Sequence, residues 1–337
     1  MAPTPRERVW LAIRHQQPDR VPYHFGYTQP CRRMVEAHYG TAGLDDLLGD
    51  HLAIFKARPQ ESWRQVGPDV WRDEWGVVWD RSVDKDIGVV VQHPLPGRSL
   101  AGYTLPDPHD PHRFARLPAF IAANGERFRI VSLGFSLYER AWALRGMADL
   151  LADMIEAPAF VDEVLDAIMA WDLQVIADAA RHDVDAILFG DDWGQQRGLI
   201  MGPRLWRRFV KPRIAVLYRA AKQAGKAVFI HCCGKVQELF PELIELGLDV
   251  FNPFQPEVMD LNEMKRLYGD RLSFYGGMSI QRVLPFGTPQ EVRAEARRLM
   301  AEIGRGGGYI FAPSHDMPGD IPVENLVAMI ETVREGS

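Results

Sequence analysis

Two residues in the second half of the sequence, His231 and Cys233, carry side chains that bind transition metals. Residues 227–231 are expected to form a short strand, and residues two apart on an extended strand point to the same side. An imidazole and a thiolate placed in this way can reach one ion, whereas Cys232 would face the opposite side. Zinc accepts both ligand types, and a catalytic zinc typically keeps one position open beside three protein ligands. His315, which follows the last expected strand, is the third candidate; alternatively, the cysteine is a small buried residue and both histidines are structural.

Asp191 and Asp192 follow another expected strand and are candidates for general acid–base catalysis. Because side chains alternate along an extended chain, only one of them should face the end of the sheet, and we favour Asp191. The alternative is that one aspartate caps the following turn while the other forms a surface ion pair.

Further residues at or near the expected strand ends are candidates for binding a small-molecule substrate. They are His24, Tyr27, Trp193, Asn252, Gln255, Gly277 and Met278. At residues 276–277 the two glycines would allow a ligand to approach the backbone closely.

The order of the elements indicates how these residues could meet. Short apolar segments alternate with segments of helical periodicity, which is typical of repeated β-α units around a parallel sheet. The expected strands are residues 21–25, 52–56, 128–133, 186–190, 227–231, 250–255, 272–276 and 309–312. The expected helices of the second half are 202–224, 236–246, 261–268, 289–303 and one that begins at Pro322.

Eight such strands predict an α/β fold, a (β/α)₈ TIM barrel, in preference to an open doubly wound sheet. The carboxyl ends of all barrel strands face one rim, where the polar residues named above would gather. Residues 69–80 contain near-alternating aromatic residues around Gly76 and are expected to form an antiparallel hairpin inserted into the barrel. No linker composition marks a boundary, so residues 1–337 are expected to form one domain.

Composition excludes several classes of protein. Hydrophobic residues at 47% and charged residues at 25% are typical of globular chains. The net charge of −6 argues against nucleic acid or an anionic membrane as the main partner. Three cysteines cannot form a disulfide framework, and neither a signal peptide nor a membrane-spanning run is evident. We therefore expect a cytoplasmic protein.

Four segments resemble the uroporphyrinogen decarboxylase superfamily. They are GDDWGQQRG at 190–198, HCCGKVQELFPELIELGLDVFNPFQP at 231–256, FYGGMSIQRVLPFGTP at 274–289 and GGGYIFAPSHDMPGDIPVENL at 306–326, with PDRVP at 18–22 as an N-terminal counterpart. Their order and spacing match the superfamily over nearly the whole chain. The resemblance implies a single (β/α)₈ barrel.

Two branches of the superfamily differ in the residues that matter here. True porphyrinogen decarboxylases grip substrate carboxylates with an arginine-rich segment, but residues 24–33 lack its RQAGR pattern despite Arg32 and Arg33. The branch of corrinoid-dependent methyltransferases resembles the chain better, and it holds zinc on an HxC pair and a later cysteine. His231 and Cys233 match the pair, whereas His315 stands in place of the later cysteine and makes the site more positive.

The resemblance implies a zinc-dependent methyltransferase that acts on a small molecule together with a corrinoid protein. The corrinoid (cobalamin) would arrive on a separate partner, because the sequence has no D-x-H-x-x-G signature. Asp191 would orient the substrate or handle its proton. One alternative is a metal-free decarboxylase of a carboxylated ring substrate, in which Asp191 or Asp192 stabilises a protonated ring. The other is a non-catalytic barrel that binds a corrinoid or methyl carrier. A homodimer, the commonest assembly, is compatible with each.

Overall fold

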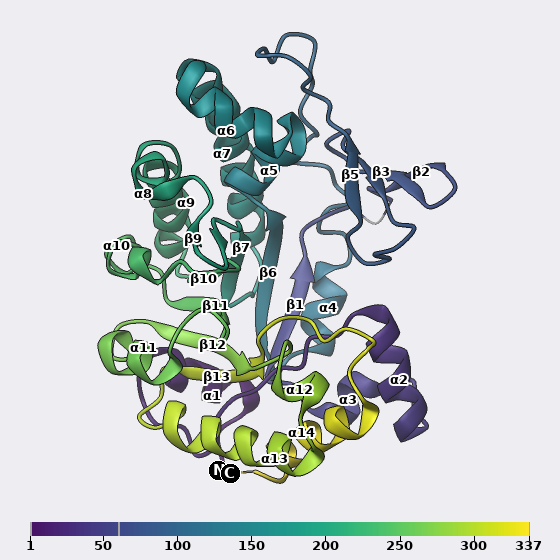
Figure 1. The fold of residues 1–337 in the computed structure, drawn as a ribbon, viewed down its shortest axis with the longest axis vertical. Helices are drawn as coiled ribbons and strands as arrows, with labels where there is room; N and C mark the ends of the chain where they lie inside the picture. The colour runs from purple at the N-terminus through teal and green to yellow at the C-terminus, as the bar shows by residue number, and fades with distance from the viewer. Residues whose placement is uncertain (1, 60, 337) are drawn as a thin grey trace.

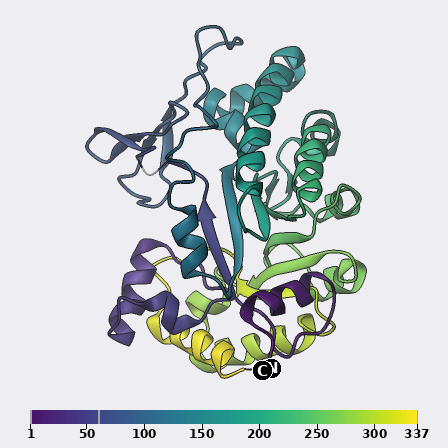
Figure 2. The same cartoon turned by 180° about the vertical axis from the view of Figure 1, so that it is seen from behind.

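The computed structural model describes residues 2–59 and 61–336, and its centre is a parallel sheet curled on itself, with helices around its outer face (Figures 1 and 2). Seven strands pair in chain order, β1-β6-β7-β10-β11-β12-β13. Their bounds are β1 Leu52–Lys56, β6 Phe128–Phe135, β7 Ala186–Gly190, β10 Ala227–His231, β11 Val250–Phe254, β12 Ser273–Met278 and β13 Tyr309–Pro313. The predicted α/β barrel architecture is confirmed.

Residues 21–25 take the eighth position of the barrel but form a single bridge instead of a strand. Tyr23 bridges to Phe311 of β13, and on its other side the Tyr23 carbonyl accepts a hydrogen bond from the His51 N–H at 3.0 Å, next to β1. Pro22 has no N–H to donate, which shortens the ladder at this point. The prediction of a full strand at 21–25 is therefore wrong, although the segment lies where the prediction places it.

Helices follow most of the strands, and short π-helical and 3₁₀ segments interrupt three of the predicted ones. The helices are α1 Pro5–Ile13, α2 Gln29–Tyr39, α3 Leu44–Leu48, α4 Leu117–Ala123, α5 Leu137–Arg145, α6 Met147–Glu156, α7 Pro158–Ala180, α8 Gly202–Leu205, α9 Lys211–Gln223, α10 Phe240–Glu245, α11 Leu261–Tyr268, α12 Val283–Phe286, α13 Pro289–Arg298 and α14 Val323–Glu335. The π-helical segments are Trp206–Val210 and Leu299–Ile303, and the 3₁₀ segment is Gln237–Leu239.

The predicted hairpin at 69–80 is part of a larger inserted sheet. Four antiparallel strands pair in the order β2-β3-β4-β5, and the hairpin corresponds to β3 and β4. The bounds are β2 Arg64–Gly67, β3 Val70–Arg72, β4 Val78–Asp80 and β5 Val89–Gln92; a separate small ribbon consists of β8 Gly194–Gln195 and β9 Gly198–Leu199. The inserted sheet stands beyond the carboxyl end of β1 (Figure 1).

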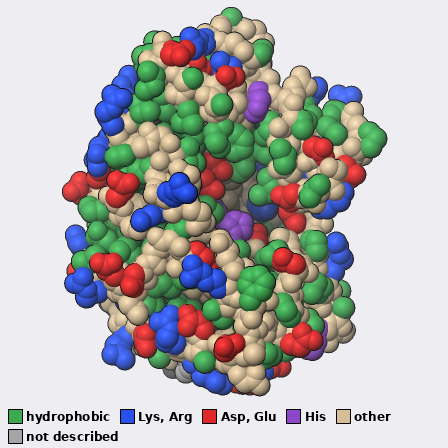
Figure 3. Space-filling model, in the orientation of Figure 1, with side chains coloured by type: hydrophobic (Ala, Val, Ile, Leu, Met, Phe, Trp, Pro, Cys, Tyr) green, Lys and Arg blue, Asp and Glu red, His purple; other side chains and the backbone are tan. Residues whose placement is uncertain are grey.

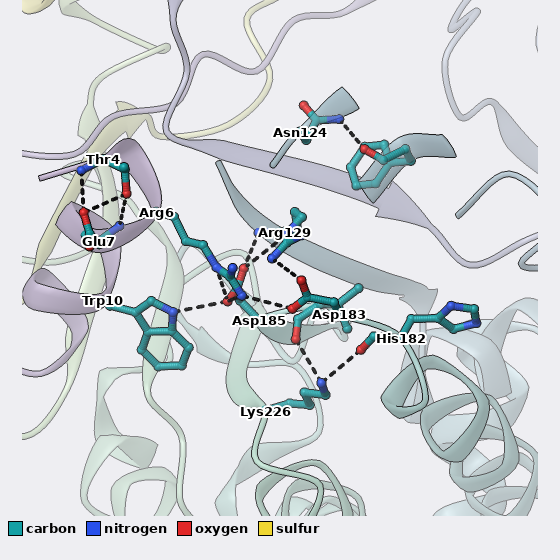
Figure 4. Close-up of polar contacts among 12 residues, drawn as sticks. Thr4, Arg6, Glu7, Trp10, Asn124, Arg129, His182, Asp183, Asp185 and Lys226 are labelled. Carbon is teal, nitrogen blue, oxygen red and sulfur yellow. Dashed lines mark hydrogen bonds and ion pairs between the residues drawn. The ribbon is translucent and has the colours of Figure 1, made fainter. Parts of the chain in front are cut away.

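Helix α1 covers the amino-terminal end of the barrel. Its residues Val9 and Ile13 pack in a buried cluster with side chains from the strands. A polar network adds to this contact: Arg6 pairs with Asp185 at 2.8 Å, and Trp10 donates to the same carboxylate at 3.2 Å (Figure 4). Chemistry on the barrel therefore has to take place at the opposite, carboxyl end of the strands.

Within residues 2–59 and 61–336, no helix combines the length and the apolar character needed to cross a bilayer.

Candidate metal centre

The structure brings His231, Cys233 and His315 together at the carboxyl ends of β10 and β13. Their ligand atoms all lie within 4.8 Å of one another. His231 Nε2 is 3.5 Å from Cys233 Sγ, and the two imidazole rings meet edge to face with centroids 5.2 Å apart. Three donor side chains from two distant parts of the chain thus lie close enough together to reach one metal ion.

The spacing of these donors fits a zinc ion. Nitrogen and sulfur ligands of a tetrahedral zinc lie about 3.3–3.6 Å apart, given bond lengths of about 2.0–2.3 Å. The pair formed by His231 and Cys233 already has this separation, and the donor nitrogen of His315 lies within 4.8 Å of both. A His₂Cys set leaves a fourth position of the ion open, as catalytic zinc sites require.

Asn252, at the middle of β11, holds the His231 ring in one orientation. Its side-chain amide donates to the Tyr275 carbonyl at 3.0 Å, so its Oδ1 is left to accept a hydrogen bond. That oxygen lies 2.6 Å from His231 Nδ1, which therefore carries the ring proton. In the neutral ring, Nε2 is then the nitrogen with a free lone pair, and it faces the cysteine; metal-binding histidines characteristically have such a partner on their second nitrogen.

The two adjacent cysteines point in different directions, as the strand geometry predicts. Cys232 is fully buried, and its sulfur accepts a hydrogen bond from the Trp193 N–H at 3.3 Å. Cys233 is partly exposed, and its backbone N–H donates to Asp192 at 2.7 Å. Burial, with the Asp192 carboxylate next in effect, raises the pKa of the Cys233 thiol, and binding of a metal ion would displace its proton.

The two candidate aspartates are placed in the wall of the barrel, outside the lining of the central cavity. Asp191 is buried, and its carboxylate accepts hydrogen bonds from the Glu139 N–H at 2.7 Å and from the Trp193 indole N–H at 2.5 Å. Burial raises the pKa of Asp191 to about 7. Asp192 is used to hold the backbone of Cys233. The Asp191 carboxylate thus binds the start of α5 and Trp193, and only Asp192 supports a loop that carries a donor, Cys233.

Glu139 is a carboxyl group of the cavity wall that sequence reasoning missed. It lies in the first turn of α5, directly after β6, and lines the cavity. Burial raises the pKa of Glu139 well above its ordinary value, and Asp192 and Asp191 raise it further. One feature of the sequence does point to Glu139 as a site residue: it follows soon after the carboxyl end of an expected strand, 128–133.

The cavity itself has a volume of about 650 Å³ and opens among the strand ends. A hollow near the middle of the face drawn in Figure 3 has histidine and acidic side chains on its walls. Of the seven candidate substrate-binding residues, three line this cavity and four do not. The former are His24, Tyr27 and Asn252; the latter are Trp193, Gln255, Gly277 and Met278.

The four residues outside the cavity lining have packing or positioning roles. Trp193 is buried against Trp206, and Met278 is fully buried. Gln255 accepts a hydrogen bond from the Gly234 N–H at 2.8 Å, directly after Cys233. Gly277 has the Tyr309 hydroxyl 2.6 Å from the place of an added Cβ, so that hydroxyl occupies the space a side chain would take.

Asp50, which lines the cavity, should make the free energy of unfolding depend on pH. It is 6% exposed and accepts a hydrogen bond from the Phe25 N–H, and burial raises its pKa from 3.8 to about 8. The folded protein therefore keeps a proton that the unfolded chain loses, and stability present below pH 4 is lost as the pH rises toward 8. Between pH 5 and 7, the free energy of unfolding should fall by about 1.4 kcal/mol per pH unit relative to Asp50→Asn.

Urea denaturation of both proteins at pH 5, 6 and 7 measures this difference. The asparagine variant keeps the acceptor for Phe25 but cannot ionise. Equal pH dependence of the two proteins would contradict the assignment of a protonated Asp50.

The molecule is thus a (β/α) barrel with a cavity and a cluster of metal-binding side chains at the carboxyl ends of its strands. A family model described as uroporphyrinogen decarboxylase (URO-D) matches residues 137–336. The chain belongs to this family. The matched part contains all three donor residues but leaves out the PDRVP segment at 18–22.

Relatives with both activities resemble the chain. It is 25% identical over 194 residues to a uroporphyrinogen decarboxylase of Methylococcus capsulatus, covering 55% of this chain and 51% of that protein. It is 26% identical over 183 residues to a methylated-thiol–coenzyme M methyltransferase of Methanosarcina mazei, covering 54% and 46%. These matches span about half the length of either relative. A solved methyltransferase from Methanosarcina mazei superposes with a TM-score of 0.75 over 99% of both chains at 18% identity, which establishes the shared fold.

Proposed function

We propose that this chain is a zinc-dependent methyltransferase that moves a methyl group between a small-molecule substrate and a corrinoid protein. The observation that carries the proposal is the convergence of His231, Cys233 and His315 beside one cavity. The relative named as a thiol methyltransferase and the solved methyltransferase support the same reading.

The three donors would hold the zinc ion at the wall of the cavity, which both histidines line. When bound, zinc supplies Lewis acidity to a substrate heteroatom, keeping a thiol as thiolate or stabilising a departing oxygen. Asn252 keeps His231 Nε2 available as a donor. Glu139 can hold or release a substrate proton on the cavity wall. The corrinoid would be presented by its own protein at the open end of the barrel.

Metal analysis and a transfer assay test the proposal together. Protein purified without a histidine tag is expected to hold about one zinc per chain. A methyl thioether or methyl ether is then incubated with free cob(I)alamin, and methylation of cobalt is followed by absorbance. Less than about a tenth of an equivalent of zinc after supplementation would overturn the proposal. Release of carbon dioxide from a porphyrinogen would support the decarboxylase alternative.

Replacement of Asn252 tests the orientation of His231. Asn252→Ala removes the acceptor for Nδ1–H, so the ring can turn or change tautomer. The affinity for zinc is expected to fall by about 10–100-fold, with transfer activity at saturating zinc largely retained. Competition against a chromophoric chelator measures the affinity. Asn325→Ala is the matched control, because Asn325 is a buried asparagine in α14 whose side chain hydrogen-bonds only to the Leu284 and Gly287 carbonyls among the described residues. Equal zinc affinity in Asn252→Ala and the wild type would argue against this role.

A further inference from the structure

A second hollow adjoins the central cavity where the inserted sheet meets the barrel. It has a volume of about 240 Å³ and is lined by Lys56, Arg58 and Arg81. Lys56 ends β1, and Arg58 follows in a turn in which its N–H donates to the Lys56 carbonyl at 2.8 Å; both residues line the hollow. Arg81 follows β4 of the inserted sheet. Lys56 also lines the central cavity, so the two spaces share a wall.

These three cations have few partners. Across residues 2–59 and 61–336, the side chains of Lys56 and Arg58 form neither an ion pair nor a hydrogen bond. Arg81 donates to the backbone carbonyls of Ile87 and Asp86, and its guanidinium lies 3.9 Å from the centre of the Trp63 ring. None of these contacts neutralises its charge.

The acidic residues around the hollow are mostly engaged elsewhere. Asp73 pairs with Arg140 at 3.2 Å. Glu74 binds Arg113 through both of its oxygens, at 3.1 and 2.8 Å. Asp86 also lines the hollow and forms no ion pair with any described residue. Among the described residues, three lining cations without an ion-pair partner thus face one lining carboxylate without an ion pair, Asp86, while Asp84 attracts Arg81 from outside the hollow; an excess of positive charge remains.

The three positive charges also repel one another, which adds to the effect of partial burial in lowering the pKa values of Lys56 and Arg58. Lys56 and Arg58 stay partly in contact with solvent, but partial desolvation in the hollow lowers the pKa of Lys56, and Arg58 and Arg81 lower it further, while Asp316 and Asp86 raise it. Burial likewise lowers the pKa of Arg58, followed by repulsion from Arg81 and Arg116. Proteins keep such an unfavourable arrangement where a ligand later supplies the missing opposite charge.

We propose that the hollow binds an oxyanion, a carboxylate or a phosphate, of the substrate whose methyl group reacts at the three-donor cluster. The anion would lie against Lys56, Arg58 and Arg81, and the rest of the molecule would pass Lys56 into the central cavity toward His231 and His315. The link to a methylated substrate rests on the proposed function; the anion site stands on the residues of the hollow alone. Such a substrate gains charge-assisted hydrogen bonds away from the reacting atom.

Titration calorimetry of the full chain with simple probes tests this site. The probes are benzoate, phenyl phosphate and, as the neutral control, benzyl alcohol, at pH 7 and low salt. At least one anion is expected to bind with a dissociation constant below about 1 mM, more weakly as salt is added, and the alcohol is not. The tighter of the two anions identifies the substrate as a carboxylate or a phosphate ester. Failure of both anions to bind at about 20 mM would overturn the proposal.

Two variants locate the binding. Lys56→Met and Arg58→Gln should each weaken anion binding by about tenfold or more. Arg219→Gln is the control, because Arg219 is an exposed arginine of α9 on the outside of the barrel. The anion affinity of this variant should match that of the wild type. The melting temperatures of Lys56→Met and Arg58→Gln should equal or exceed that of the wild type, since a repelling cation is removed. Unchanged anion affinity in both variants would contradict the assignment.

The outcome is separable from that of the proposed function. Calorimetry requires no methyl transfer, and it can be repeated after removal of metal by a chelator. Anion binding without any transfer reaction would support the anion site and contradict the methyltransferase function. Transfer without anion binding would support the methyltransferase function and contradict the anion site.

Discussion

Replacing Cys233 with alanine is expected to lower bound zinc from about one equivalent per chain to below about 0.1, and methyl transfer by about a thousandfold or more. Cys233 is the donor that can contribute a negative charge to the cluster, and its sulfur lies 3.5 Å from His231 Nε2. Without it, two neutral imidazoles remain. The side chain is partly exposed, so the free energy of unfolding of the metal-free protein should change by less than about 1 kcal/mol.

Cys232→Ala is the matched control for this result. The neighbouring thiol is fully buried and contacts the Trp193 N–H on the other side of the strand end. The control should therefore lose about 1 kcal/mol of stability and keep its zinc. Elemental analysis and urea denaturation of both variants give the comparison. Zinc retained in Cys233→Ala, or lost from a folded Cys232→Ala, would contradict the proposed ligand set.

Local signals in the sequence were sufficient for most of the fold. The strand at 52–56 and the helix at 261–268 have the predicted bounds. Thr288 caps α13 with Glu291 as its reciprocal partner, which is why the start of that helix could be placed. These elements are determined by residues close in sequence, so their prediction does not require knowledge of the tertiary structure.

The inserted sheet was predicted only in part, for a physical reason. β3 and β4 carry the alternating aromatic residues that indicate a half-buried hairpin. β2 is largely exposed, and β5 exposes Val89 and Val91, so neither shows the alternation of a strand with one buried face. Edge strands of this kind are defined by their hydrogen-bonding neighbour rather than by their own sequence.

The sequence predicts the part of the candidate site that lies at the strand ends. It does not predict the part that depends on contacts between distant segments. The barrel topology makes residues after β10 and β13 neighbours, and the structure places their donor atoms within 4.8 Å. Asn252, predicted as a substrate-binding residue, lines the cavity, and its amide also binds His231 and a backbone carbonyl, a contact that no local motif indicates. Glu139 and the cations at Lys56 and Arg58 have no local motif. Their significance comes from the partners around them, which only the folded chain specifies.

The loop that carries Cys233 packs closely against another backbone segment at Gly234. Replacing this glycine should therefore strongly lower the stability of the protein. Gly234 has a φ of +88°, and an added Cβ would lie 2.4 Å from the Gly194 carbonyl carbon and 2.5 Å from the Gln195 nitrogen. Both are backbone atoms of β8, in the segment after β7, so neither can move aside easily. Gly234→Ala should lower the free energy of unfolding by about 3–5 kcal/mol, from the clash and the left-handed backbone together. It should also displace Cys233 and reduce zinc binding.

Gly225→Ala separates the two contributions. Gly225 has a φ of +71°, and nothing lies within 4 Å of its added Cβ. The variant should lose only about 1–2 kcal/mol, the contribution of the left-handed backbone, and keep its zinc. The difference between the two variants, measured by urea denaturation, isolates the steric contact between the loops after β7 and β10. Equal losses would show that the loops can separate freely, and the Cys233 sulfur would then be held by Asp192 and Gln255 rather than by the packing of the two backbones.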